Sequence, residues 1–125
     1  MYFSPYLVYT WGVICFKGAP IIKQAKPTAQ PGQNIINISC GNNHVTAVDA
    51  YGDLFVLGSN EFGQLGLEGE LHAKTFKKLS SVWIGPVRKA FCLADATFMV
   101  TRDEEVFFCG RISHNRDPIE KPRQG

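Results

Sequence analysis

The side chains of this sequence that could do metal or nucleophile chemistry are its histidines and cysteines: His44, His72, His114, Cys15, Cys40, Cys92 and Cys109. A histidine at the start of a strand, where we expect His44, can act as a metal ligand or a general base. No second ligand or nucleophile lies at a useful spacing from it, and the cysteines form no C-x-x-C pair. We therefore expect His44 to be a hydrogen-bonded structural residue and all four thiols to be reduced.

The sequence contains even less evidence for an enzyme or nucleic-acid-binding motif. The sequence has no phosphate-binding Gly-x-x-x-x-Gly-Lys-Ser/Thr loop, no Gly-x-Ser-x-Gly elbow and no His-Glu-x-x-His helix. The residues from His114 to Asp117 are expected to form a solvated tail rather than a site. The aromatic residues before Lys17 could stack on nucleic-acid bases, but core positions in strands explain them better. We predict no enzyme activity, no metal and no cofactor.

Composition places the chain among globular domains. It has 125 residues, of which 45% are hydrophobic and 19% charged, so a packed core is expected. The 13 basic and 11 acidic residues nearly balance, so the bulk charge argues against nucleic acid or chromatin as a partner. The apolar opening segment is interrupted by Pro5 and Gly12 and has no basic flank, so we expect neither a signal peptide nor a membrane helix.

An internal repeat organises the sequence. The segment from Ile36 matches the segment from Arg88 at a constant offset, which places Cys40 on Cys92 and Gly58 on Gly110. A partial earlier copy ends at Gly12, 46 residues before Gly58. Repeats of about 50 residues, each able to bury only part of its surface alone, are typical of propeller blades.

Each repeat is predicted to contain short antiparallel strands. Residues 44–49 and 53–58 should pair about a turn at Tyr51 and Gly52, and residues 96–101 should pair with 105–110 in the same way. Inner strands are expected at 35–40 and 87–92. Residues 17–34 and 60–81, which are rich in proline, glycine and lysine, are expected to be loops, with a turn or two of helix possible within 70–79.

The residues from Cys40 to Leu67 closely resemble the repeat of the regulator of chromosome condensation family. The positions that carry this resemblance are Gly41, His44, Gly52, Gly58, Asn60, Gly63, Gln64, Leu65, Gly66 and Leu67. The second copy departs from the pattern, because Leu93 replaces the first glycine and Ala96 replaces the histidine. Within the family the chain is similar to the propeller of the retinitis pigmentosa GTPase regulator and to propeller-bearing kinases.

The resemblance implies an all-β fold, a partial β-propeller of about two to two and a half blades from a seven-bladed family. The expected division is a partial blade and linker at 1–34, a complete repeat at 35–81, a degenerate repeat at 82–111 and a tail at 112–125. In the complete repeat, Gly63 and Gly66 should permit a tight loop that returns Leu65 and Leu67 to the blade, while Gln64 bonds loop backbone.

The function that the resemblance implies is a non-catalytic protein-interaction module or scaffold, with a small GTPase as the partner class. Two alternatives stay open: guanine-nucleotide exchange with chromatin docking, and a propeller region of a larger kinase or ubiquitin ligase. We expect an intracellular protein, cytoplasmic, nuclear or ciliary, with self-association through open blade edges as a further expectation. No residue of a binding site is identified.

Overall fold

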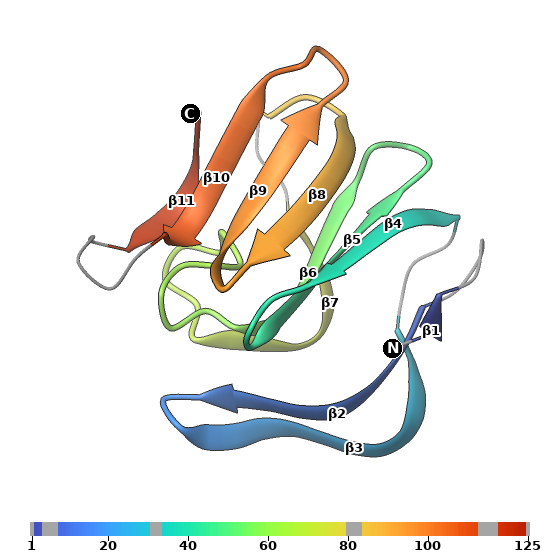
Figure 1. Cartoon of the computed structure of the whole chain (residues 1–125), viewed down its shortest axis with the longest axis vertical. Helices are drawn as coiled ribbons and strands as arrows, with labels where there is room; N and C mark the ends of the chain where they lie inside the picture. The colour runs from blue at the N-terminus through green and yellow to red at the C-terminus, as the bar shows by residue number, and fades with distance from the viewer. Residues whose placement is uncertain (1, 4–7, 31–33, 80–83, 113–117, 125) are drawn as a thin grey trace.

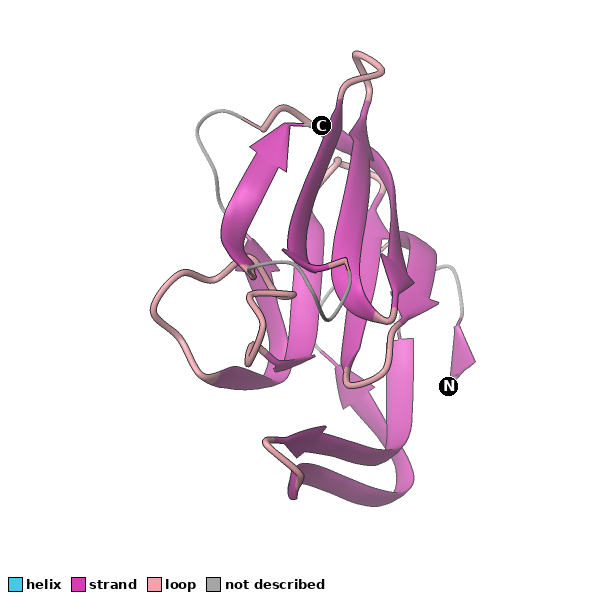
Figure 2. Ribbon diagram, turned by 60° about the vertical axis from the view of Figure 1, so that its left-hand side comes forward, coloured by secondary structure: helices cyan, strands magenta, loops and turns pink. Residues whose placement is uncertain are grey.

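The computed structural model describes residues 2–3, 8–30, 34–79, 84–112 and 118–124, and every regular element among them is a strand. None of these residues forms a helix of the length and apolarity that crossing a membrane requires. The strands form one three-stranded and two four-stranded antiparallel sheets (Figures 1 and 2). Their bounds are β1 Tyr2–Phe3, β2 Val8–Phe16, β3 Ala19–Gln30, β4 Ile35–Cys40, β5 His44–Asp49, β6 Leu54–Ser59, β7 His72–Leu79, β8 Val87–Leu93, β9 Asp95–Thr101, β10 Val106–Arg111 and β11 Ile119–Gln124.

We call the three sheets blade 1 (β1–β3), blade 2 (β4–β7) and blade 3 (β8–β11). In Figure 1 they follow one another from the blue N-terminal sheet to the red C-terminal sheet, and each lies beside the next. The all-β partial propeller expected from the sequence is confirmed.

The hairpin register predicted from the repeat is also confirmed. In blade 2, His44 lies opposite Gly58 and Val48 opposite Leu54. In blade 3, the pairs 52 residues later are Ala96 with Gly110 and Val100 with Val106. The inner strands β4 and β8 also repeat this offset, and each carries a bulge one residue after its start. The sequence repeat is therefore a repeat of hydrogen-bond register.

The hairpin turns of blades 2 and 3 both need a residue with positive φ, and they use different residues for it. Gly52 has a φ of 91°, which glycine adopts without steric cost. The turn of the second copy has no glycine, and Glu104, 52 residues after Gly52, takes a φ of 66° instead. The conformation is thus imposed by the tight antiparallel connection rather than by glycine itself.

The outer strands β3, β7 and β11 are where the sequence expectations were wrong. Residues 17–34 and 60–81 were expected to be loops, the latter with a helical turn, yet they contain β3 and β7. Part of the predicted tail, residues 119–124, forms β11. These strands lie at a sheet edge, where lysines can face water and proline costs no ladder bond, so their composition resembles that of loops. The cluster from His114 to Asp117 lies outside the described residues.

A shared irregularity marks the point where the outer strand of each blade meets the strand beside it, which is β2, β6 or β10. The register shifts by two residues between Thr10 and Gly12, between Val56 and Gly58, and between Phe108 and Gly110. All three glycines have φ values between 98° and 122°. A side chain at Gly58 or Gly110 would also collide with the neighbouring strand of its own blade. The recurring glycine therefore lets its strand bend opposite the extra residues of the outer strand.

Two apolar clusters hold the blades together, one in each space between them. Blade 1 contributes Val8 and Ile22 to the first cluster, which packs on Val45, Ala47 and Leu57 of blade 2. The opposite face of blade 2 contributes Val48, Leu54 and Val56 to the second cluster, which includes Met99 and Phe107 of blade 3. Successive residues of β5 and β6 thus point to opposite neighbours, which explains why both strands are almost wholly buried.

Candidate functional site

The histidine of the repeat lies in the space between blades 2 and 3. The His44 side chain is 1% exposed, and its Nε2 atom lies 3.2 Å from the carbonyl oxygen of Ala96. Because a carbonyl oxygen can only accept, Nε2 carries the proton and donates it. Burial lowers the pKa of His44 to about 4, with the Ala96 carbonyl and the Asp95 carboxylate opposing this effect. The ring is therefore neutral near pH 7 and joins two blades.

Gly41 is required by the position of that ring. A Cβ atom at residue 41 would lie 2.5 Å from His44 Nδ1, closer still to Cε1, and 2.7 Å from the Ala94 carbonyl oxygen. The backbone N–H of Gly41 donates to the His44 carbonyl at 2.8 Å. Blade 3 has lost both residues of this pair together, since Leu93 and Ala96 stand 52 residues later. Without a histidine ring at 96, a side chain at 93 meets no such conflict.

The loop at residues 60–71 is fastened by one asparagine. Asn60 Nδ2 donates to the carbonyls of Leu67 at 2.7 Å and Glu70 at 2.8 Å, and its Oδ1 accepts from Leu65 N–H at 2.9 Å. These bonds close the loop on itself, while Leu65 is fully buried in the cluster shared with blade 3. Leu67 packs against the edge of the same cluster.

Gln64 joins this loop to blade 3. Its side chain is 1% exposed, and its Oε1 accepts the N–H of Phe62 at 2.8 Å within the loop. Its backbone carbonyl accepts the Thr97 hydroxyl at 2.6 Å. Gly110 of blade 3 also lies close to this loop, because a Cβ atom there would be 3.1 Å from the Gln64 Cα. The Gly-Gln-Leu-Gly segment therefore forms a joint between blades.

The remaining glycines of the motif serve close packing at separate places. Gly52 lies at the opposite end of the blade, where a Cβ atom would meet Pro86 Cβ at 2.7 Å and the Gly52 carbonyl accepts from Val87 N–H at 2.9 Å. Gly66 lies against Pro122 of β11 and Leu79 of β7. The structure thus brings most motif residues to the boundary between blades 2 and 3, where Gly52 contacts blade 3 at the opposite end from the loop.

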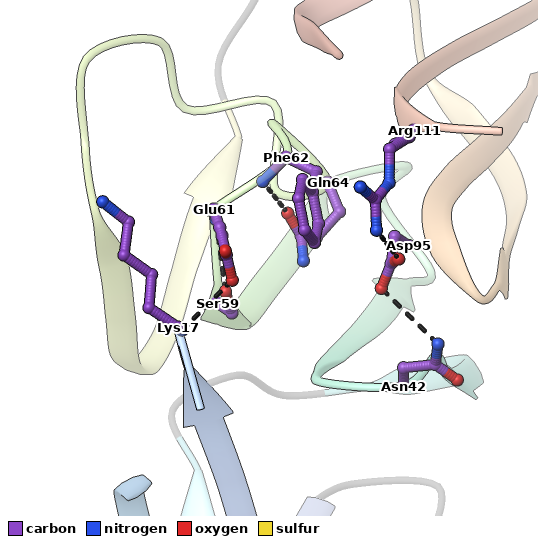
Figure 3. Close-up of polar contacts among 8 residues, drawn as sticks. All are labelled: Lys17, Asn42, Ser59, Glu61, Phe62, Gln64, Asp95 and Arg111. Atoms are coloured by element: carbon purple, nitrogen blue, oxygen red, sulfur yellow. Dashed lines mark hydrogen bonds and ion pairs between the residues drawn. The ribbon is translucent and has the colours of Figure 1, made fainter. Parts of the chain in front are cut away.

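Polar groups from all three blades meet around the same loop (Figure 3). The guanidinium carbon of Arg111 lies 3.5 Å from the centre of the Phe62 ring, and Arg111 also pairs with Asp95 at 3.0 Å. Asn42 approaches the other carboxylate oxygen of Asp95 at 3.5 Å. On the other side of the loop, Glu61 accepts the backbone N–H of Lys17 at 3.1 Å. We call this set the rim row: Lys17, Asn42, Glu61, Phe62, Asp95 and Arg111.

Blade 1 reaches the rim row through the hairpin of β2 and β3. After Gly12, where blade 2 has its long loop, β2 continues to Phe16 and returns through a two-residue turn at Lys17 and Gly18. The hairpin is fixed to blade 2 by the Cys15 N–H, which donates to the Asn43 side chain at 2.9 Å. Its tip is thereby held beside Glu61 (Figure 3).

The rim row could not be recognised directly in the sequence, because its members come from separate segments. One signal was nevertheless present. Asp95 and Arg111 stand 52 residues after Asn43 and Ser59, and they lie opposite each other in the register of β9 and β10. Two neutral residues of the first copy are thus replaced by an ion pair in the second, whose side chains are only 15% and 18% exposed.

The described residues contain no group of three or more histidine, cysteine or acidic side chains that could hold a metal ion. None of the four cysteines takes part in a disulfide bond. Burial raises the pKa of the Cys109 thiol to about 12, with the nearby Cys92 adding to the effect. Cys40, by contrast, is exposed.

Comparison with known proteins agrees with this architecture. Residues 35–64 match the model of the regulator of chromosome condensation (RCC1) repeat. The chain carries an RCC1 repeat. Over 76 residues it is 36% identical to the secretion-regulating guanine nucleotide exchange factor of Mus musculus, covering 61% of this chain and 16% of that protein.

Two solved structures share the fold of the RCC1-repeat chain. Human WBSCR16 superimposes with a TM-score of 0.78 at 22% identity, over 96% of this chain and 33% of that one. Yeast RCC1 (Prp20), solved bound to Kap60, gives a TM-score of 0.68 at 17% identity, over 100% and 38% of the two chains. The chain thus spans about a sixth of the mouse protein and about a third of each solved structure.

Proposed function

We propose that this RCC1-repeat chain is a protein-interaction module, and that the rim row is the surface that contacts its partner. The observation that carries the proposal is the joining of loops from three blades into one continuous surface by Arg111 on Phe62 and Glu61 on Lys17. Loops held on a rigid scaffold are the usual place for binding residues. The motif histidine and glutamine are buried and support this surface from beneath.

The chemistry of the rim row favours a charged protein partner. Phe62 and Arg111 are residue types enriched at the centres of interfaces, where an aromatic ring and a guanidinium supply contact area and directed hydrogen bonds. Basic and acidic residues alternate along the row, in the order Lys17, Glu61, Arg111 and Asp95. Such a surface gives orientation and specificity to docking more than affinity.

We further propose a small GTPase as the partner. The support is the name of the mouse relative, a guanine nucleotide exchange factor, whose similarity extends over more than half of this chain. That name also supports exchange activity as a second candidate. Exchange requires the module to hold the nucleotide-free GTPase, whereas a scaffold needs only to bind it in one of its states.

One experiment separates the two candidates. The purified chain is immobilised and offered a panel of small GTPases, each prepared nucleotide-free and loaded with a fluorescent GDP analogue, and binding and nucleotide release are both recorded. Binding without faster release supports the interaction module. Faster release at catalytic amounts of the chain supports exchange, and neither binding nor release across the panel overturns the GTPase proposal.

Matched charge reversals test the surface itself. Glu61→Lys changes the rim row, while Glu104→Lys reverses an exposed charge at the hairpin of the opposite end. We expect Glu61→Lys to weaken binding by about threefold or more, as an interface charge of this kind does, and Glu104→Lys to leave it unchanged. Equal effects of the two variants would refute the assignment of the rim row.

A further inference from the structure

A cavity lies beside the rim row, between the tip of the blade 1 hairpin and the long loop of blade 2. Phe16 and Lys17 line it from blade 1, and Glu61, Glu70 and Leu71 line it from blade 2. Its volume is about 200 Å³. Because a protein cavity of roughly 150 Å³ already holds a benzene molecule, one long side chain of another molecule fits into this one.

The repeat relates this cavity to a filled position at the next boundary. Phe62 and Phe16 each stand four residues after the recurring glycine of their own blade. Each ring also lies at the boundary with the following blade. The guanidinium of Arg111 in blade 3 lies over the Phe62 ring, while the Phe16 ring packs edge-on against His72 of blade 2, with the ring centres 5.8 Å apart. Phe16 is thus the counterpart of Phe62 at the boundary between blades 1 and 2.

The arginine has no such counterpart in blade 2. The residue 52 positions before Arg111 is Ser59, which is 1% exposed and accepts the Glu61 N–H at 3.1 Å. Figure 3 shows Arg111 reaching toward Phe62 on one side of the loop and Ser59 beside Glu61 on the other. A serine side chain is too short to cover a neighbouring ring. The boundary between blades 1 and 2 therefore keeps the aromatic ring at Phe16 without the arginine of the repeat, and the cavity lies beside that ring.

Two carboxylates of the cavity can take the charge of a cation. Glu61 accepts the backbone N–H of Lys17, and Glu70 pairs with Lys77. A carboxylate has about four acceptor sites, so each of the two can accept a further donor. The charged residues that line the cavity are these two glutamates and Lys17, so negative charge exceeds positive charge there.

The apolar part of the lining suits the stem of a long cationic side chain. Leu71 is 64% exposed and presents its side chain beside Phe16. The Phe16 ring already attracts a cation, since the Lys17 ammonium lies 5.4 Å from its centre, against 3.5 Å for the Arg111 guanidinium over Phe62. Because Lys17 is exposed in a two-residue turn, a more closely held guanidinium can displace it.

We propose that this cavity receives an arginine side chain of the protein partner, with its guanidinium on Phe16 and beside Glu61 and Glu70. The inference rests on the proposed function, because it takes the rim row as the contact surface and names what the partner inserts next to it. Arginine is favoured over lysine because its planar head both stacks on a ring and bonds a carboxylate through two N–H groups. The partner thereby supplies across an interface the contact that Arg111 makes within the chain.

Titration of the isotope-labelled 125-residue chain with the peptide acetyl-Gly-Arg-Gly-amide tests the proposal without the partner. The backbone amide signals of residues 69–71 are followed by NMR, and they are expected to shift in a saturable way. Citrulline has the shape of arginine without its charge. The same peptide with citrulline in place of arginine should therefore bind about fivefold more weakly, and the lysine peptide should also bind more weakly than the arginine peptide.

Two glutamates provide matched variants. Glu70→Gln removes a cavity carboxylate that is not part of the rim row, and Glu104→Gln removes a carboxylate that also pairs with a strand cation but lies at the far hairpin. We expect Glu70→Gln to weaken binding of the arginine peptide about threefold and Glu104→Gln to leave it unchanged. Lys17→Met removes the competing cation and should tighten binding, a result that damage to the fold does not produce.

Circular dichroism verifies the fold of each variant. Equal affinity for the arginine and citrulline peptides, unshifted signals at residues 69–71, equal effects of Glu70→Gln and Glu104→Gln, or weaker binding by Lys17→Met would overturn the proposal. Failure of the GTPase panel removes the proposed partner and leaves the peptide result standing. Failure of the peptide titration removes the arginine site and leaves the rim row to its own charge-reversal test, so the two proposals are refuted by different measurements.

Discussion

Replacing Gly41 by alanine tests the central joint between blades 2 and 3. The φ angle of Gly41 is not in the left-handed region, so backbone strain does not enter. The added methyl group would lie 2.5 Å from His44 Nδ1 and 2.7 Å from the Ala94 carbonyl oxygen. Neither neighbour can move freely, because the ring is buried and bonded to Ala96 and the carbonyl accepts the N–H of Asn42 at 3.0 Å.

The expected cost is that of overpacking a well-filled interior. Inserting one methylene into such a site destabilises proteins by about 1–3 kcal/mol, and two simultaneous close contacts place Gly41→Ala near the upper end. Equilibrium urea unfolding followed by circular dichroism measures the change. Gly85→Ala is the matched control, because a Cβ atom there meets nothing within 4 Å and its φ is not in the left-handed region.

A double-mutant cycle then measures the energetic coupling between Gly41 and His44. His44→Ala alone removes the ring and its bond to Ala96, which should cost about 2–4 kcal/mol. With the ring gone, the methyl group of Gly41→Ala enters vacant space, so the double variant should be at least about 1 kcal/mol more stable than the sum of the singles predicts. Strict additivity, or a Gly41→Ala chain as stable as the Gly85→Ala control, would refute the reasoning.

Three further predictions follow from the same geometry. The folded-state pKa of His44, about 4 against 6.5 unfolded, means that the unfolded chain binds the extra proton between these values, so stability is complete above pH 6.5 and is lost as the pH falls. Urea titrations at pH 7 and pH 5 should differ by about 2 kcal/mol from this group, a difference that His44→Gln abolishes. Asn60→Ala removes three loop bonds and should cost about 2 kcal/mol, with faster hydrogen exchange in residues 60–71 as the local readout; unchanged exchange there would contradict the clamp. In the native chain a maleimide should label the exposed Cys40 and leave the buried Cys109 untouched until urea is added, as peptide mass spectrometry checks; labelling of both at equal rates would be inconsistent with this packing.

The sequence by itself determined the repeat and its hairpins. Alternating side chains fix which residues of two neighbouring strands can share a face, and the short turns at Tyr51 and at Asp103 fix the register. Because these constraints are local, the sequence offset of 52 residues correctly predicts that both hairpins have the same register. His44 pairs with Gly58, and Ala96 pairs with Gly110.

The outer strands form because of tertiary structure, and local sequence does not predict them. Residues 72–79 pair with β6 although four of their side chains are exposed, because the edge of each sheet supplies backbone partners regardless of polarity. Local sequence cannot distinguish such an edge strand from a charged loop, since only its pairing partner differs.

The purpose of the motif residues also emerged only from the fold. The φ angle of Gly41 is one that any residue can adopt. A methyl group cannot be added there because the His44 ring and the Ala94 carbonyl, 3 and 53 residues away in the sequence, occupy the space. The rim row likewise depends on segments from all three blades, which become neighbours only when the blades stack. Contacts between distant segments form only when the blades pack against each other. The sequence pattern therefore indicated that these residues are important, and the packing between the blades explains why.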